Sequence, residues 1–119
     1  MIRTSCHCGR VTIEIARPPE TLTQCDCSIC RRYGVLWAYY RESEVRITAA
    51  PGSTDRYAWG RQSICFVRCA GCGCISHWER TSSDRDDRIG INARNFTPGQ
   101  IGPARIRRLD GALTEEYLD

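Results

Sequence analysis

Apolar and polar residues alternate in short runs along this chain. The clearest run covers residues 10–16, where Val11, Ile13 and Ile15 take every second position and polar residues lie between them. A period of two with β-branched residues predicts a strand that buries one face. Shorter runs rich in β-branched and aromatic residues predict eight further strands, at 22–25, 35–40, 45–47, 55–59, 63–68, 75–79, 89–93 and 105–109.

Turn-forming residues separate these runs. A proline pair starting at Pro18 ends the first one, and a turn at Gly60 lies between two runs that we expect to form a hairpin. Residues 28–33 are expected to make one helical turn that Gly34 ends, and residues 84–88 to form a charged turn. No segment has a helical period longer than two turns. The sequence therefore predicts a mainly β fold with little helix.

Length and charge restrict the class of protein. The 119 residues are expected to fold as a single domain, 1–119, with a core small enough for a structural metal to help stabilise it. No apolar run approaches the ~20 residues that cross a bilayer, and no signal peptide is apparent, so we expect a cytoplasmic protein. The net charge of +3 neither requires nor excludes an anionic partner. All 17 basic residues are arginine, which excludes lysine-based catalysis.

The cysteines carry most of the chemistry that can be read from the sequence. Seven of the nine fall into three tight groups: Cys6-His7-Cys8, Cys25-Asp26-Cys27-Ser28-Ile29-Cys30 and Cys69-Ala70-Gly71-Cys72. In a reducing compartment, clustered cysteines are more often metal ligands than disulfides. The odd total of nine also leaves no complete set of disulfides. We therefore interpret the groups as metal ligands.

The three groups divide into four thiolates plus three. Four thiolates complete a tetrahedral zinc site, whereas three leave one coordination position open for water or substrate. Closed sites are usually structural and open sites usually catalytic. The sequence thus predicts a structural zinc on the first and third groups, with ligands Cys6, Cys8, Cys69 and Cys72. It predicts a second zinc, able to take part in chemistry, on the middle group of Cys25, Cys27 and Cys30.

Several points about these groups stay open at this stage. Gly71 and Gly73 are expected to supply the positive φ that a tight zinc knuckle needs. The middle group has two alternatives to a metal site, a set of unmetallated thiols and a local disulfide. If it does hold zinc, the fourth ligand is water, a substrate thiol, or a further cysteine, Cys65 or Cys74, folded close by.

Other candidate residues have both a functional and a structural interpretation. His77 is a candidate general base, but its place in an apolar strand favours a hydrogen-bonded core histidine. Arg31 and Arg32 follow the middle group and either attract an anionic substrate or form a solvated pair of charges. The basic run at 105–108 is interpreted as a strand face, not as a nucleic-acid surface.

The order of the cysteine groups, with their flanking glycines, resembles that of one protein family. The chain is similar to the glutathione-dependent formaldehyde-activating enzymes, whose relatives include centromere protein V. The similarity runs from about residue 5 to the end of the sequence. The matching segments are Ser5-Cys6-His7-Cys8-Gly9-Arg10-Val11, residues 25–34, Cys69-Ala70-Gly71-Cys72-Gly73 and residues 108–119.

The resemblance implies a β-tent, in which several short folded sheets are joined by zinc knuckles. It implies a structural zinc and a second zinc, on the two cysteine sets given above. It further implies a carbon–sulfur lyase that joins formaldehyde and glutathione to give S-hydroxymethylglutathione, with Cys25, Cys27 and Cys30 as the catalytic residues. The partners would then be a small thiol and an aldehyde. The lack of a long apolar run and the balance of acidic and basic residues, not the resemblance, argue against a membrane or nucleic-acid partner. The chain departs from the founding enzyme in being shorter and in carrying Cys65 and Cys74.

Two other functions remain open from the sequence. The scaffold also has non-enzymatic relatives, so the chain could be a zinc-stabilised binding module without catalysis. Alternatively, the middle cysteine group could act as a redox sensor that releases zinc on oxidation.

Overall fold

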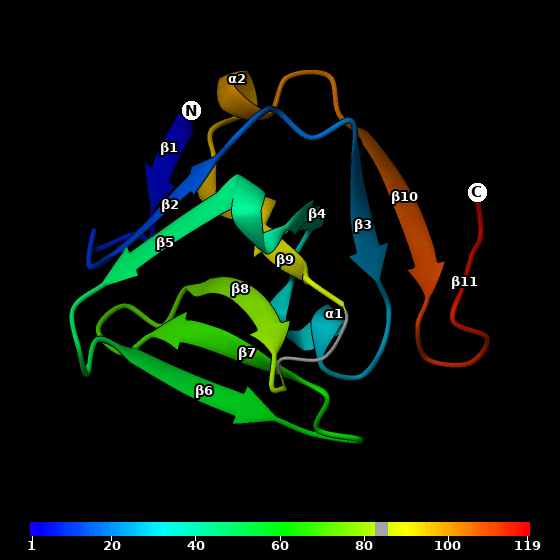
Figure 1. Ribbon diagram of the computed structural model, residues 1–119. Helices are drawn as coiled ribbons and strands as arrows, with labels where there is room; N and C mark the ends of the chain where they lie inside the picture. Colours follow the sequence, from blue (N-terminus) through cyan, green and yellow to red (C-terminus); the bar gives the residue numbers. More distant parts are fainter. Residues whose placement is uncertain (83–85) are drawn as a thin grey trace.

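The computed structural model describes residues 1–82 and 86–119 and contains two β-sheets (Figure 1). The smaller sheet has three antiparallel strands in the order β1-β2-β5. Its strands are β1 (Ile2–Ser5), β2 (Val11–Ile15) and β5 (Val45–Ala49). Strand β2 is the predicted alternating strand, and its apolar residues Val11, Ile13 and Ile15 are all buried.

The larger sheet has eight strands in the order β11-β10-β3-β4-β9-β8-β7-β6. Neighbouring strands run antiparallel, except that β10 runs parallel to β3. The bounds are β3 (Thr21–Cys25), β4 (Trp37–Arg41), β6 (Thr54–Ala58), β7 (Ile64–Cys69), β8 (Ile75–Arg80), β9 (Arg88–Asn92), β10 (Arg105–Asp110) and β11 (Glu116–Tyr117). Figure 1 shows the late strand β10 beside the early strand β3, which brings distant parts of the chain together.

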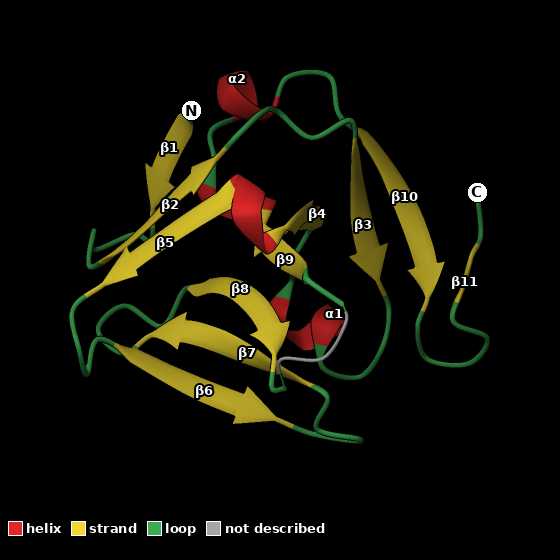
Figure 2. Cartoon of the chain, viewed as in Figure 1, coloured by secondary structure: helices red, strands yellow, loops and turns green. Residues whose placement is uncertain are grey.

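Turns and loops make most of the connections between strands, and the helical segments among the described residues are short (Figure 2). They are α1 (Cys30–Tyr33), α2 (Pro98–Ile101) and two 3-10 turns at Glu42–Glu44 and Ala93–Asn95. Gly34 follows α1 with a φ of 67°, a left-handed conformation that glycine adopts without steric cost. The prediction that Gly34 ends this helical turn is therefore confirmed.

The mainly β fold predicted from the sequence is confirmed. Each of the nine predicted strands is present within two residues of its expected bounds, and β6 and β7 form the predicted hairpin. The predicted charged turn at 84–88 includes residues 84 and 85, which lie outside the described residues. Its last residue, Arg88, begins β9.

Two strands, one helix and the two 3-10 turns were not predicted. Strand β1 has no alternating pattern and is ordered by its pairing with β2, where Ile2 lies opposite Ile15. Strand β11 has only two residues, too few for any pattern. Helix α2 does have a sequence pattern that predicts a helix start. Thr97 and Gln100 form a capping box, and Pro98 lies in the first turn.

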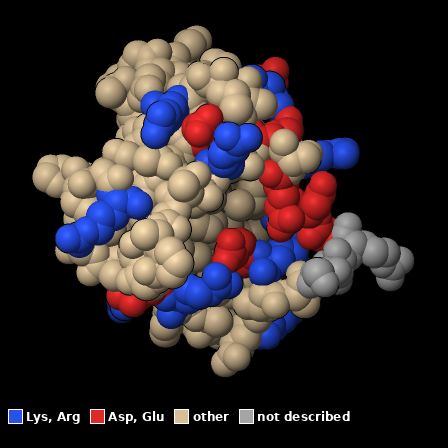
Figure 3. All heavy atoms as spheres, turned by 60° about the vertical axis from the view of Figure 1, so that its left-hand side comes forward, with Lys and Arg blue, Asp and Glu red and all other residues tan. Residues whose placement is uncertain are grey.

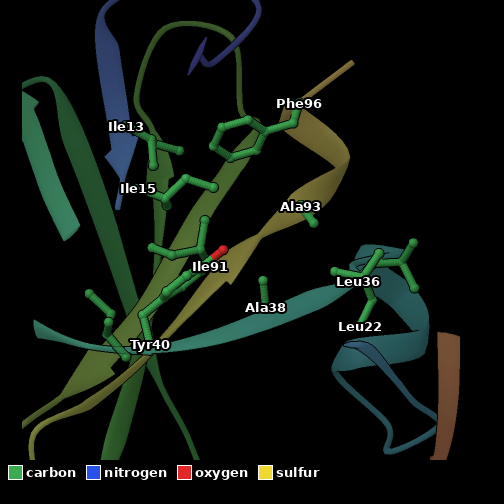
Figure 4. Close-up of a cluster of buried hydrophobic side chains, with 10 residues drawn as sticks. Ile13, Ile15, Leu22, Leu36, Ala38, Tyr40, Ile91, Ala93 and Phe96 are labelled. Atoms are coloured by element: carbon green, nitrogen blue, oxygen red, sulfur yellow. The ribbon is translucent and has the colours of Figure 1, made fainter. Parts of the chain in front are cut away.

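The main core cluster joins the two sheets (Figure 4). Ile13 and Ile15 of β2 pack in the same cluster as Tyr40 of β4 and Ile91 of β9, and Phe96 covers one end. A second cluster lies within the larger sheet, between the start of α1 and strands β4, β7 and β8. It contains Cys30, Val35, Trp37, Phe66, Ile75 and Trp78. Because Cys30 belongs to this second cluster, core packing fixes the position of the middle cysteine group.

Candidate metal centres

Four cysteines from the two sheets meet at one point. Cys6 follows β1 and Cys8 lies in the turn to β2, whereas Cys69 ends β7 and Cys72 lies in the turn to β8. Their Sγ atoms all lie within 4.8 Å of one another. The Cys6–Cys8 and Cys8–Cys69 sulfur pairs are 3.7 and 3.5 Å apart. A tetrahedral ion with ~2.3 Å metal–sulfur bonds places its sulfurs about 3.8 Å apart, so this four-cysteine group can hold a metal ion.

Backbone amides already point at the sulfurs of the four-cysteine group. The N–H of Val11 donates to Cys6 Sγ at 3.4 Å, and the N–H groups of Gly71 and Cys72 donate to Cys69 Sγ at 3.3 and 3.5 Å. Hydrogen bonds of this kind favour the charged thiolate. The turns around the sulfurs are therefore arranged to support metal-bound thiolates.

The two glycines of the second knuckle have different roles. Gly73 has a φ of 80°, as predicted for a tight turn. The prediction of positive φ was wrong for Gly71, whose φ is not in the left-handed region. A Cβ atom at Gly71 would lie 1.7 Å from a guanidinium nitrogen of Arg10, so a larger residue there would displace the end of that flexible side chain. The side chain of Arg10 thus packs against the knuckle at Gly71.

The middle group, which we call the cysteine trio, lies at the end of β3. Cys25 is the last residue of β3, Cys27 lies in the following turn, and Cys30 begins α1. Their Sγ atoms also lie within 4.8 Å of one another, so the trio can hold a metal ion. The backbone N–H of Cys30 donates to Cys27 Sγ, and the indole N–H of Trp37 donates to Cys30 Sγ, both at 3.4 Å.

Neither remaining cysteine completes the trio. Cys65 is buried and accepts a hydrogen bond from Arg56 at 3.0 Å, and Cys74 packs against the four-cysteine group. Within residues 1–82 and 86–119, no other cysteine, histidine or carboxylate joins the trio's group. Cys65 and Cys74 are therefore excluded as the fourth ligand of a metal ion at the trio. A water molecule and a substrate thiol remain as candidates for that coordination position.

The crowded thiols influence one another's protonation. The pKa of Cys25 is lowered to about 6, chiefly because Cys30 donates a hydrogen bond to it. The pKa of Cys30 is raised, because its proton is held in that same hydrogen bond and its side chain is buried. In the four-cysteine group, the backbone N–H of Cys74 is the main cause that lowers the pKa of Cys72 to about 5. The trio therefore has one thiol inclined to ionise, and the four-cysteine group has two, because backbone N–H groups also lower the pKa of Cys69. The thiolate is the form that binds metal.

The cysteine trio lies between two pockets. One, which we call the arginine pocket, has a volume of about 370 Å³ and is lined by Cys25 and Cys30 with Arg31, Arg94 and Arg108. The other, the aromatic pocket, has a volume of about 410 Å³ and is lined by all three cysteines with Trp37, Tyr39, Trp59, Phe66 and Trp78. The four-cysteine group lines neither pocket. An adjoining pocket thus distinguishes the trio from the four-cysteine group, whose Cys8 is exposed at the surface.

The turn after β10 lies against the trio. The backbone N–H of Asp26 donates to Leu109, and the Asp26 carboxylate accepts from the N–H of Ala112 at 3.1 Å. A Cβ atom at Gly111 would lie only 2.3 Å from Cys25 Sγ. This contact was missed from the sequence, which gives no sign that residues so far apart are neighbours. It arises from the parallel pairing of β10 with β3, in which Leu109 lies opposite Cys25.

His77 is a hydrogen-bonded core residue. Its Nδ1 lies 2.8 Å from Ser76 Oγ and its Nε2 lies 3.1 Å from Glu79 Oε2, and the residue is buried. Side chains alternate along a strand, so His77 faces away from the side on which its neighbour Trp78 lines the aromatic pocket. The core interpretation of His77 therefore fits the structure, and the general-base role has no geometric support.

Glu79 joins His77 to Arg56 and provides a test of this buried network. The hydrogen bond from His77 lowers the pKa of Glu79, and the charge of Arg56 lowers it further. Because the folded pKa lies below the ordinary 4.5, the stabilisation is present above that pH and is lost as the pH falls through the folded pKa. We expect Glu79→Gln to lower the free energy of unfolding at pH 7 by about 1–3 kcal/mol.

Urea unfolding at several pH values checks this prediction. The difference between wild type and Glu79→Gln should shrink as the pH falls below about 4.5. Metal loss in acid affects both proteins and cancels in the comparison. Glu20→Gln, at an exposed position, serves as the matched control and should leave the curve unchanged. A difference between wild type and Glu79→Gln that is independent of pH would contradict the role given to the carboxylate.

Surface charges on the described part of the chain are of both signs. On the face shown in Figure 3, arginine and acidic side chains are interspersed and form no continuous basic stripe among the described residues. In the basic run at 105–108, Arg107 lies over the ring of Tyr117 at 3.8 Å, and Arg108 pairs with Asp119 at 3.3 Å. No helix among the described residues is long and apolar enough to cross a membrane.

Fold and site together define a mainly β protein with two cysteine clusters that can hold metal ions. The family model of the glutathione-dependent formaldehyde-activating enzymes matches residues 1–105, and the chain belongs to this family. Its fold is also similar to the crystal structure of a Rhodobacter sphaeroides protein solved in a structural genomics programme, with a TM-score of 0.71 and 28% sequence identity. The match covers 88% of this chain and 99% of that one. No curated protein matches the sequence significantly.

Proposed function

We propose that this protein is a zinc-dependent carbon–sulfur lyase that acts on thiol–aldehyde adducts of the S-hydroxymethylglutathione type. The family is associated with glutathione-dependent formaldehyde activation, which gives the reaction class. Within this proposal, Cys6, Cys8, Cys69 and Cys72 hold a structural zinc, and Cys25, Cys27 and Cys30 hold the zinc at which the reaction occurs.

The observation that carries the proposal is the unequal environment of the two cysteine groups. The four-cysteine group has a full set of ligands and lines neither pocket, with Cys6 and Cys69 buried and Cys8 exposed at the surface. The trio has three ligands and opens to two pockets. A metal site with three protein ligands and solvent access is typical of catalysis, whereas a closed tetrahedral site is typical of structure.

The trio and the residues around it have different tasks in this proposal. Zinc bound there would hold a substrate thiol as its thiolate, the nucleophilic form. Cys25, Cys27 and Cys30 orient the site, and the hydrogen bonds from Cys30 N–H and Trp37 Nε1 hold two of the sulfurs in place. The aromatic pocket, with Phe66 and Trp78 in its wall, would limit the access of water to the reacting carbon.

The proposed reaction is balanced without a further reagent. A carbon–sulfur bond forms between the thiol sulfur and the formaldehyde carbon, while the carbonyl double bond becomes a single bond. The thiol proton ends on the former carbonyl oxygen, which gives a hydroxymethyl thioether. The lyase direction breaks the same carbon–sulfur bond and returns the proton to sulfur.

Replacement of one trio ligand tests the proposal. Exchange between isotope-labelled formaldehyde and glutathione at equilibrium can be followed by exchange NMR with the zinc-loaded protein. We expect Cys27→Ser to lower the exchange rate to that of the uncatalysed reaction, because one ligand of the open site is lost. Circular dichroism and one retained zinc would show that the variant is still folded.

Cys65→Ser is the matched control, because Cys65 is a buried cysteine outside both groups. A serine there can still accept the hydrogen bond from Arg56. Its exchange rate should equal that of the wild type. A folded Cys27→Ser protein with the wild-type exchange rate would contradict the proposed function.

A further inference from the structure

We infer that Arg31, Arg94 and Arg108 form a carboxylate-binding subsite that selects an acidic thiol and presents it to the cysteine trio. This inference rests on the proposed function, since it concerns which thiol the trio receives. It assigns the arginine pocket to the thiol and leaves the aromatic pocket for the uncharged aldehyde, because the two arginines that line the aromatic pocket, Arg80 and Arg88, are engaged with Asp86 and with the ring of Tyr39.

The three guanidinium groups come from separate parts of the chain. Arg31 lies in α1, Arg94 in the 3-10 turn after β9, and Arg108 in β10. They line one pocket of about 370 Å³ together with Cys25 and Cys30 of the trio. Convergence of three arginines at a thiolate site is not a consequence of sequence proximity. It results from β10 lying beside β3 and from the turn at Ala93–Asn95 lying near the end of α1.

Two of the three arginines are free to bind an anion. In the described part of the chain, the side chain of Arg31 makes no hydrogen bond. Arg94 uses only its Nε, which donates to the carbonyl oxygen of Gly34. That bond orients the guanidinium group and leaves its terminal nitrogens as donors. Arg108 is held by Asp119 through its Nε and its backbone N–H.

Acidic groups cancel only part of this charge. Asp26 is the one carboxylate among the described residues that line the pocket, and it already accepts a hydrogen bond from Ala112. Asp26 contributes one negative charge to the pocket and Asp119 pairs with Arg108, so three guanidinium groups face two carboxylates and one net positive charge remains. Guanidinium groups bind carboxylates through paired N–H donors, which gives both affinity and orientation.

The position of the subsite beside the trio explains why its ligand would be a thiol. Cys25 and Cys30 line the same pocket as the arginines, so one small molecule can contact both. A molecule with a carboxylate at one end and a thiol at the other fits both halves of the pocket. A neutral thiol fits only the half formed by the cysteines and should bind less tightly.

Two thiols that differ mainly in charge test the inference. Isothermal titration calorimetry of the zinc-loaded protein would compare 3-mercaptopropionate, which has a carboxylate, with 2-mercaptoethanol, which has a hydroxyl group. In the double variant Arg31→Gln/Arg94→Gln, we expect the affinity for 3-mercaptopropionate to fall about tenfold or more, because charge-assisted hydrogen bonds are lost. The affinity for 2-mercaptoethanol should not change. An equal loss for both thiols, or no loss for either, would overturn the inference.

Arg32→Gln is the matched control. Arg32 lies next to Arg31 in α1, but its guanidinium group donates to the Ser28 carbonyl oxygen and does not line the arginine pocket. Its removal changes the net charge by the same amount as one of the test substitutions. Thiol affinities in this variant should equal those of the wild type. A comparable loss of 3-mercaptopropionate binding would show a general charge effect and overturn the subsite.

A ligand with a blocked sulfur separates the subsite from the proposed reaction. S-methylglutathione keeps both carboxylates of glutathione but cannot bind zinc as a thiolate. Binding that is lost in Arg31→Gln/Arg94→Gln and kept in Cys27→Ser would support the subsite, even if thiol–formaldehyde exchange proved absent. If the double variant binds S-methylglutathione and exchanges formaldehyde as the wild type does, the subsite is overturned and the proposed function stands.

Discussion

Cys69→Ser is expected to abolish the cooperative unfolding transition of this protein. Cys69 ends β7, is 1% exposed and lies 3.5 Å by its sulfur from Cys8, which is 61 residues away in the sequence. A metal ion bound by the four-cysteine group would join the smaller sheet to the larger one across this long loop. Structural zinc contributes about 10–16 kcal/mol of apparent binding free energy in small zinc domains, which is comparable with the total stability of a domain.

Far-ultraviolet circular dichroism during thermal and urea unfolding would measure this effect. Cys74→Ser is the matched control, because Cys74 packs against the same group without belonging to it. We expect that variant to keep its cooperative transition within about 1 kcal/mol of the wild type. A Cys69→Ser protein that unfolds at the wild-type midpoint would show that the four-cysteine group does not hold a stabilising metal.

Gly111→Ala is expected to remove metal from the trio while the fold is kept. A Cβ atom at this position would lie 2.3 Å from Cys25 Sγ and 3.3 Å from Cys27 Cβ, so the turn and the ligand cannot both stay in place. The turn is also held by Asp26, which lies between two of the trio's cysteines. Residues that position metal ligands commonly change affinity by roughly 10–100-fold, and we expect a loss of at least this size.

Chelator competition after cobalt substitution would measure the affinity of the two sites separately. Gly99→Ala is the matched control, because its Cβ would meet only Thr97 Oγ1, at 4.0 Å. Its metal content should equal that of the wild type. Two bound ions with unchanged affinity in Gly111→Ala would contradict this prediction. They would show that the turn at Gly111 does not hold Cys25 in position for metal binding.

Most of the strands could be predicted from the sequence because each has a local pattern. Strand β2 is the clearest case, since alternation of Val11, Ile13 and Ile15 reports directly on burial of one face. Strand β1 could not be predicted, because its residues are placed by pairing with β2 and not by a pattern of their own. Gly71 shows the same limit for turns, since its contact with the Arg10 side chain is tertiary and its backbone angle is not left-handed.

The two cysteine groups could also be predicted, because ligand spacing is a property of the local sequence. Whether Cys65 or Cys74 joined the trio could not be decided, since that depends on how β7 and β8 are placed relative to β3. Only part of the arginine pocket could be predicted from the sequence. Arg31 adjoins Cys30 in the sequence, whereas Arg94 and Arg108 reach the trio through tertiary structure alone. Non-local strand pairing accounts for each of these gaps.

The most direct test of the four-plus-three division is the zinc content per chain. The protein would be purified anaerobically without added metal, and zinc and iron would be measured by elemental analysis. We predict two zinc ions per chain in the wild type and one in Cys27→Ser, without iron. A single zinc in the wild type that is unaffected by Cys27→Ser would leave the trio without metal and contradict the proposed reaction centre.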